Sequence, residues 1–387
     1  MWCWPRSRTS SHFVNQLMVS LASGYGNFAV PAAALEAATA ALASVEQRHA
    51  PLEVSAAAGL LELREALAQR YRQRGAVGLT AAQVLVTARA KTGLFALLSE
   101  MLRPGDDVLM PTPNWFGFND LVHRAGGILR TLPLAAADGY ILRPVALRAA
   151  LTPATRVLIL SNPNNPTGRV YARAEWEALL AVTADFPQLW VLSDEIYEGI
   201  CFGSEPVPTL LALPDPHQRH VVVSGFSKSL ALAGWGVGCL VAPPALAAAV
   251  AARVFSTGVA VPVPAQAAAL AATQHAEAIS AALCAQLRTN RLLLEAGLAA
   301  LPGAPRVLAP EGTYYIFADF TRFLAPGIPA AEASAQLVQR LAAGGVDVVD
   351  GATCGAPGFA RLSYAVEEVV LRQALARLQE VLVPLAG

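Results

Sequence analysis

The sequence predicts an α/β protein whose mostly parallel sheet lies between layers of helices. From Val84 onward, short apolar segments rich in Val, Ile and Leu alternate with longer amphipathic segments, a pattern typical of parallel strands buried on both faces. The 387 residues suffice for one large domain or two ordinary ones, and 55% of them are hydrophobic. Only 14% are charged, which excludes a disordered, solvated chain.

The elements of this fold can be assigned in order along the chain. We expect strands at 84–87, 107–110, 156–161, 189–194, 220–225 and 237–242, and helices at about 92–102, 115–125, 173–185 and from Pro244. After about residue 275 the pattern changes to a long helix, strands near 314–319, 346–349 and 360–364, and a last helix from about Glu368. We therefore predict a large domain over 45–275. A smaller α+β domain is expected from 276–387 together with the N-terminal segment 1–44.

Composition excludes several classes of protein. Lys+Arg and Asp+Glu both total 28, so no basic surplus exists to bind nucleic acid. Two uncharged stretches, 229–252 and 254–274, are long enough to span a membrane, but their Gly and Pro residues indicate buried strands, turns and helices instead. The N-terminal segment MWCWPRSRTSSHFVNQLMVSLASGYG resembles an irregular leader rather than a signal peptide, and Met18 is a second candidate start.

The positions of the cysteines and histidines predict a protein of a reducing compartment that has no metal site. The five cysteines are widely separated and lack CxxC spacing, which favours free thiols in a cytoplasmic protein over a disulfide or zinc framework. The six histidines form no ligand-like cluster, so we predict no metal site.

Polar residues follow five of the predicted strands. Open α/β sheets bind their ligands at the carboxyl ends of the strands. The segments that fall there are 87–91, 114–115, 161–168, 194–197 and 224–229. They predict a single site at one edge of the sheet.

Three of these segments carry specific chemistry. SNPNNPTG (161–168) is a rigid turn that presents three asparagines, or else an ordinary helix-entry loop. Asp194, in DEIY, ends an apolar strand, where a carboxylate needs a cation or several donors unless it lies at the surface. Lys228, in SGFSK, precedes uncharged sequence; apolar surroundings would make it a nucleophilic amine, although most lone lysines are solvated.

In this order, and followed by GW (234–235), the three motifs together are specific for one family of enzymes. From about residue 20 to residue 384 the chain resembles the class I and II aminotransferases, enzymes of fold type I that use pyridoxal 5'-phosphate. The resemblance implies the fold-type-I architecture, a large domain with a mostly parallel sheet between helices plus a smaller α+β domain.

The resemblance also implies a role for each matching residue. Lys228 matches the lysine that carries the cofactor and moves the substrate proton, and Asp194 matches the acid that keeps the pyridine nitrogen protonated. Asn165 and Tyr197 match donors to the ring oxygen. Trp115 matches the aromatic residue stacked on the ring, or is a core tryptophan.

Further residues match cofactor and substrate positions. Arg361, in FARLSYA, matches the arginine that binds the substrate α-carboxylate with Asn165. Gly24 begins GYGNFAVP, which is similar to the family's segment over the substrate. The cofactor positions also include Arg89, Ala90, Lys91 and Ser227.

Four positions depart from the family pattern. Gly236 replaces the usual cation that binds the cofactor phosphate, whereas Arg89 stands where glycine is customary. Val54 replaces a tyrosine that often reaches across from the partner subunit, and Asp350 replaces a proline. One hypothesis is that Arg89 restores the missing charge; the alternative is that it points to solvent and the phosphate is held weakly.

The resemblance implies an aminotransferase that moves an amino group from an L-amino acid to a 2-oxo acid in ping-pong half-reactions, as a homodimer. The same lysine, aspartate and asparagine would serve a pyridoxal-phosphate-dependent lyase or cyclase, and the departures leave open a degenerate, non-catalytic homologue. The sequence does not identify the amino acid. No second arginine is placed for a side-chain carboxylate, and Tyr25, Phe28, Trp115 and Tyr314 favour an apolar or aromatic pocket over one for aspartate.

Overall fold

The computed structural model describes residues 18–44, 57–256 and 260–385 of the chain. Residues 1–17 of the expected leader, with Cys3, and the departure at Val54 lie outside the described residues.

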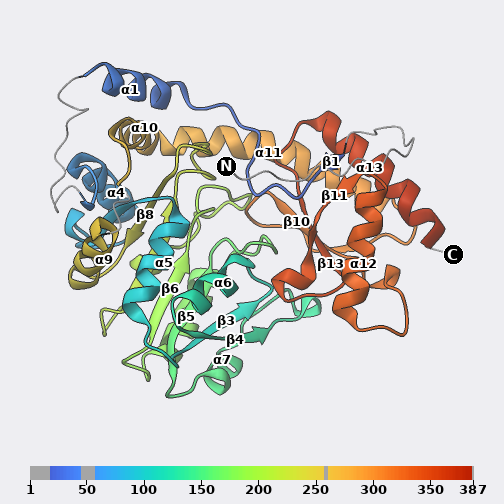
Figure 1. Cartoon of the computed structure of the whole chain (residues 1–387), viewed down its shortest axis with the longest axis horizontal. Helices are drawn as coiled ribbons and strands as arrows, with labels where there is room; N and C mark the ends of the chain where they lie inside the picture. The colour runs from blue at the N-terminus through green and yellow to red at the C-terminus, as the bar shows by residue number, and fades with distance from the viewer. Residues whose placement is uncertain (1–17, 45–56, 257–259, 386–387) are drawn as a thin grey trace, which may run out of the picture.

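A seven-stranded sheet forms the centre of the larger part (Figure 1). Its order is β2-β8-β7-β6-β5-β3-β4, and its pairs are parallel except the two made by β8, with β2 and with β7. The strands are β2 (Val84–Ala88), β3 (Asp107–Thr112), β4 (Ile128–Pro133), β5 (Thr155–Ser161), β6 (Trp190–Asp194), β7 (His220–Gly225) and β8 (Val237–Val241). The mostly parallel sheet predicted from the sequence is confirmed.

Strand β4 was not expected from the sequence. It lies at the edge of the sheet, where its residues are exposed or half-buried. It also carries Arg130, whose Nε lies 3.0 Å from Asp107 Oδ1. An edge strand needs no continuous apolar segment, so the signal that marks the central strands is absent here.

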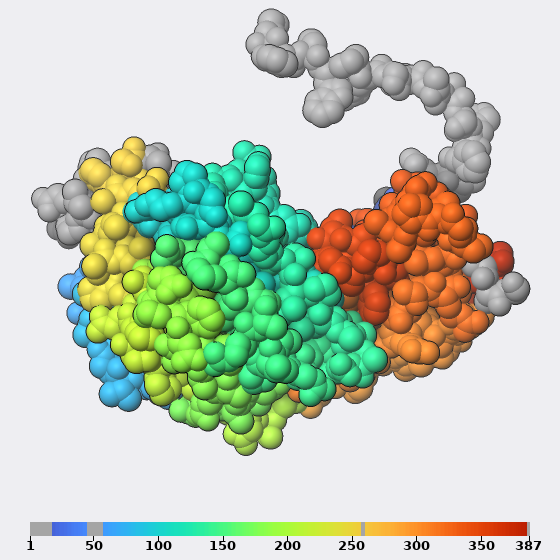
Figure 2. Space-filling model, turned by 90° about the horizontal axis from the view of Figure 1, so that it is seen from below, coloured from blue at the N-terminus to red at the C-terminus, as the bar shows by residue number. Residues whose placement is uncertain are grey.

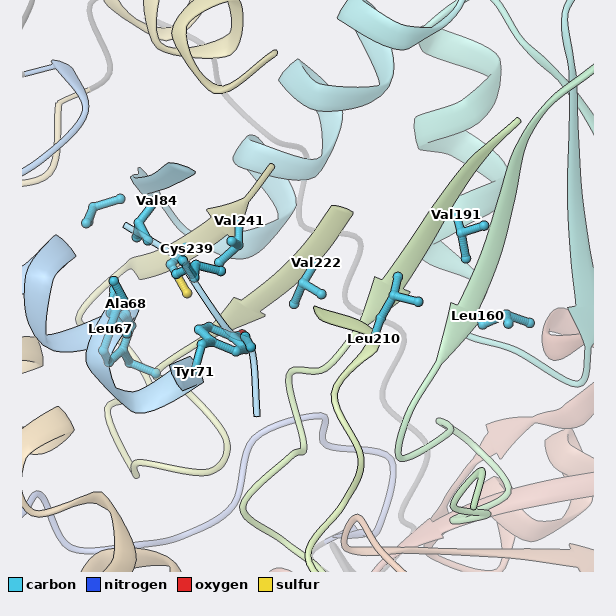
Figure 3. Packing of buried hydrophobic residues seen from close by; sticks show 14 of the residues in the cluster. Leu67, Ala68, Tyr71, Val84, Leu160, Val191, Leu210, Val222, Cys239 and Val241 are labelled. Atoms are coloured by element: carbon cyan, nitrogen blue, oxygen red, sulfur yellow. The ribbon is translucent and has the colours of Figure 1, made fainter. Parts of the chain in front are cut away.

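Alternate residues of the strands pack into two separate cores. On one face, Leu158 and Leu160 of β5 pack with helices α4, α7, α8 and α10; on the other, Val157 and Ile159 pack with α5, α6 and α9. Figure 3 shows the first core, with Leu67 and Tyr71 of α4 near β8. The helices are α4 (Leu61–Gln73), α5 (Ala90–Met101), α6 (Gly117–Arg124), α7 (Pro144–Ala150), α8 (Arg173–Thr183), α9 (Pro244–Ser256) and α10 (Val263–Gln274).

Residues from Ala276 onward, orange and red in Figures 1 and 2, form a smaller α+β part beside the first, and strand β1 joins it. Its antiparallel sheet has the order β12-β13-β10-β9, and β1 pairs in parallel with β11. The strands are β1 (Val19–Ser20), β9 (Arg306–Val307), β10 (Tyr315–Asp319), β11 (Val346–Asp347), β12 (Val349–Asp350) and β13 (Phe359–Ser363), and the helices are α11 (Ala276–Ala299), α12 (Ala330–Ala343) and α13 (Glu368–Leu382). Short 3₁₀ helices lie at Ala81–Gln83, Ala136–Asp138, Leu210–Ala212, Thr321–Phe323, Gly351–Cys354 and Val383–Leu385.

The first described residues contact both parts. Strand β1 joins β11 of the smaller part, whereas helix α1 (Ala32–Ala43) lies along α10 and contributes Ala34 and Ala38 to the core of the larger part. The division into domains at residues 44/45 and 275/276 stays a prediction. Within the described ranges, every helix is too short or too polar to cross a bilayer.

Candidate active site

The polar segments that follow the strands meet at one cavity of about 380 Å³. It lies where the carboxyl ends of the central strands face the smaller part, because its walls combine residues of β6 and β7 with residues of β10, β12 and β13. All eleven predicted site residues line it: Gly24, Arg89, Ala90, Lys91, Trp115, Asn165, Asp194, Tyr197, Ser227, Lys228 and Arg361. The sequence prediction of a single site at this edge therefore agrees with the geometry.

Lys228 is a buried amine with an unusually low pKa. It follows β7 and is 9% exposed. Its Nζ donates a hydrogen bond to the carbonyl of Gly24 and lies 3.6 Å from the ring centroid of Tyr25. Burial, and then the charge of Arg361, lower its pKa from 10.5 to about 7, while Asp194 acts in the opposite direction. A large fraction of this amine is thus neutral and nucleophilic near pH 7.

Asp194, the last residue of β6, is the one acid that lines the cavity among the described residues. Burial raises its pKa from 3.8 to about 6, opposed by a hydrogen bond of 3.2 Å from the Ile196 N–H to Oδ1 and by the charge of Lys228. Glu195 raises the pKa further. The carboxylate is ionised at neutral pH but costly to keep so, which suits a site that receives a cationic group.

A buried ionic network, which sequence reasoning missed, supports the loop after Asp194. Glu195 is fully buried and accepts hydrogen bonds from Thr209 Oγ1 (3.0 Å) and the Leu210 N–H (2.9 Å). Its other oxygen lies 3.3 Å from Arg74 Nη2, and Arg74 also pairs with Glu198. Arg70 of α4 lies 2.7 Å from Glu198 Oε1, so the network holds two cations and two carboxylates and anchors the end of β6 to helix α4. The second acid of DEIY was the sequence signal for it.

Arg361 joins the two sheets at the cavity wall. It lies on β13, is 3% exposed, and donates from Nη1 to Asn165 Oδ1 (3.1 Å) and from Nη2 to the Ala22 carbonyl (2.9 Å). Its Cζ lies 4.1 Å from the ring centroid of Tyr315. Its buried Nε has no hydrogen-bond partner among the described residues. A buried guanidinium with an unused donor is well suited to bind a carboxylate.

Three tyrosines pack edge to face beside these groups. The hydroxyls of Tyr197 and Tyr315 are 2.7 Å apart, and Tyr314 donates to the Gly24 carbonyl at 2.7 Å. Burial raises the pKa of Tyr197 well above its usual value, so its hydroxyl stays protonated. Of the aromatic residues expected in the pocket, Tyr25 and Trp115 line it, whereas Tyr315 lines it in place of Tyr314. Phe28 instead packs on Tyr314, with ring centroids 6.0 Å apart.

Known proteins resemble the chain over nearly its whole length. The family model for aminotransferase class I and II matches residues 17–378. The chain belongs to the class I and II aminotransferases. It is 35% identical to the aspartate/prephenate aminotransferase of Thermus thermophilus over 94% of this chain and 91% of the relative. It is 29% identical to a bifunctional aspartate and glutamate/aspartate-prephenate aminotransferase of Petunia hybrida, over 95% of this chain and 77% of that one.

Solved structures of such aminotransferases share the fold. The aspartate aminotransferase of Thermus thermophilus with maleate matches with a TM-score of 0.85 and 33% identity, covering 94% of this chain and 91% of the other. The enzyme of Rhizobium meliloti matches with a TM-score of 0.86 and 28% identity, covering 95% and 92%. The predicted fold-type-I architecture is thereby confirmed. The named relatives are aminotransferases, which does not favour the lyase or cyclase or the degenerate homologue.

Proposed function

We propose that this aminotransferase binds pyridoxal 5'-phosphate in the cavity and moves an amino group from an L-amino acid to a 2-oxo acid in two half-reactions. The observation that carries the proposal is the convergence on one cavity of Lys228, which follows β7, Asp194 at the end of β6, and Arg361 on β13. A nucleophilic amine, a buried carboxylate and a guanidinium with an unused donor are the groups this chemistry requires.

The residues of the cavity fit the cofactor. Lys228 would hold its aldehyde carbon, Asp194 its pyridine nitrogen, and Asn165 and Tyr197 its ring oxygen, while Trp115 supplies an aromatic surface for the ring. When bound, the cofactor supplies an electron sink for the electron pair left on the substrate Cα after proton removal.

Residues of this chain bind the substrate, move its proton and donate hydrogen bonds in the cavity. Arg361 binds and orients the α-carboxylate of the amino acid through its guanidinium fork. Lys228, with a pKa of about 7, would remove the α-proton as a neutral amine and, as an ammonium group, would donate a proton to the cofactor carbon that takes up the amino group. Burial raises the pKa of both Tyr197 and Tyr315, so the two hydroxyls stay protonated and can donate hydrogen bonds without adding charge to the cavity.

A direct assay tests this function. The purified chain, loaded with pyridoxal 5'-phosphate, is incubated with a panel of L-amino acids and with pyruvate or 2-oxoglutarate as acceptor. We expect stoichiometric formation of the new 2-oxo acid and the new amino acid, measured by chromatography. A loaded chain that forms neither product from any donor would contradict the proposal.

We infer further that the substrate carries a second carboxylate, recognised by Lys91. Four cationic side chains line the cavity within the described residues: Arg89, Lys91, Lys228 and Arg361. Lys91 lies exposed in the first turn of α5. The relatives quoted above are named for aspartate, prephenate or glutamate, which supports an acidic substrate. Lys91 would then bind the side-chain carboxylate in place of a second arginine.

Replacing Lys91 with Met is expected to lower kcat/KM for L-aspartate by about 10- to 100-fold, because one charge-assisted hydrogen bond is lost. L-Alanine, which lacks the second carboxylate, serves as the internal control and should change less than about twofold. Both rates are measured with saturating cofactor. An equal loss for both donors would contradict the assignment.

We also infer that the chain is a cytoplasmic homodimer. Leu35 and Leu42 lie seven residues apart on one face of α1 and are 53% and 59% exposed, and Leu61 of α4 is 52% exposed. Exposed apolar side chains of this kind support a contact with a second copy. The cysteines among the described residues are all free, which supports a reducing compartment.

Light scattering should give twice the mass of the chain, and the double variant Leu35→Glu/Leu42→Glu should shift it toward that of a single chain. Val145→Glu, on exposed α7, is the matched control and should leave the mass unchanged. An active wild-type monomer would overturn the dimer.

A further inference from the structure

Arg89 has a backbone conformation that non-glycine residues rarely adopt. It precedes the first turn of α5 with φ of 69° and ψ of 149°. Its N–H donates to the Gly236 carbonyl at 2.8 Å, and its carbonyl accepts hydrogen bonds from Thr87 Oγ1 (3.0 Å) and the Gly93 N–H (3.3 Å). These bonds hold the loop between β2 and the start of β8, and so fix where the Arg89 side chain begins.

Gly238 of β8 makes room for this loop, and Gly236, the residue before β8, lies beside the Arg89 side chain. A Cβ at Gly238 would lie 2.2 Å from the Ala90 nitrogen, so only glycine lets the loop rest directly on β8. A Cβ at Gly236 would meet the Arg89 side chain alone, with Cγ at 3.9 Å and Nε at 4.0 Å. The side chain of Arg89 therefore runs beside the space that a longer residue at position 236 would fill.

The surroundings of Arg89 favour an anion. Arg89 is exposed, and its guanidinium makes no hydrogen bond or ion pair with the described residues. No side chain caps the first turn of α5, whose leading N–H groups lack partners within the helix. This wall of the cavity therefore presents unused donors and positive charge. The acid of the cavity, Asp194, belongs to another wall, at the end of β6.

We propose that Arg89 binds the phosphate of the cofactor, together with the first N–H groups of α5, and supplies the cation that Gly236 lacks. The proposal rests on pyridoxal 5'-phosphate being the cofactor. A guanidinium at the uncapped start of a helix can pair with two phosphate oxygens while backbone N–H groups bind the third. Phosphate binding by Arg89 also gives its strained backbone a function, since φ of 69° directs the Arg89 side chain along Gly236.

The test compares pyridoxal 5'-phosphate with pyridoxal, which lacks the phosphate. Binding of each to the cofactor-free chain is measured by equilibrium dialysis and by quenching of tryptophan fluorescence. The variants are Arg89→Ala, which removes the guanidinium, and Arg89→Gly, which also relieves the positive φ. Arg143→Ala, an exposed arginine before α7 and outside the cavity, is the matched control.

For both Arg89 variants we expect pyridoxal 5'-phosphate to bind about 10- to 100-fold more weakly, with pyridoxal binding within about twofold of wild type. Arg143→Ala should change neither. A phosphate-specific loss below about tenfold, or an equal loss for pyridoxal, would overturn the role of Arg89. A wild-type chain that binds neither compound would instead refute the proposed cofactor, so the two failures are distinguishable.

Discussion

Replacing Lys228 with Ala is expected to lower transamination by at least about 10³- to 10⁴-fold. In the proposed function, the variant loses both the amine that would hold the cofactor and the base that would move the substrate proton. Lys228 is the one buried lysine at the cavity, and its pKa of about 7 lets it accept and release a proton near neutral pH. Initial rates of 2-oxo acid formation at saturating cofactor measure the loss.

Borohydride reduction of the loaded wild-type chain, followed by peptide mapping, identifies the lysine that carries the cofactor. We expect the pyridoxyl group on Lys228 and none on Lys91, the other lysine of the cavity. Lys91→Met is the matched control and should retain the label on Lys228. A label found on Lys91 would contradict the assignment, whatever the activity of the Lys228 variant.

The central sheet and the edge that carries the cavity were predictable because their signals are local. The central strands are buried on both faces, so each appears as a continuous apolar segment, and polar residues follow where each strand ends. Strand β4 had no such signal because it lies at the edge of the sheet, with residues that are exposed or half-buried.

Contacts between distant segments were not predictable from residue types. Lys228 donates a hydrogen bond to the carbonyl of Gly24, 204 residues away in the sequence, and Arg361 donates to Asn165, 196 residues away. Which of the adjacent Tyr314 and Tyr315 lines the cavity depends on how β10 lies against β13, and no local pattern encodes that choice. The motifs identified the groups, whereas tertiary packing determined their partners.

Replacing Asp194 with Asn is expected to lower transamination by roughly 10²- to 10³-fold, because a neutral amide cannot pair with a cationic ring nitrogen in a buried site. Burial raises the pKa of Asp194 from 3.8 to about 6, so the ionised carboxylate destabilises the cofactor-free fold. A carboxyl group with a raised pKa contributes stability below pH 3.8 that is lost as the pH rises to about 6.

The same variant should therefore be more stable than wild type in the absence of cofactor, by about 1–3 kcal/mol at pH 8 and by less at pH 5. Urea unfolding of both proteins at the two pH values measures this difference. Asp138→Asn, an exposed position outside the cavity, is the matched control and should alter neither stability nor activity. A gain in stability together with a loss of activity distinguishes a carboxylate kept for its charge from one that only supports the fold. Equal stability of wild type and Asp194→Asn at both pH values would mean that the carboxylate is not strained by burial.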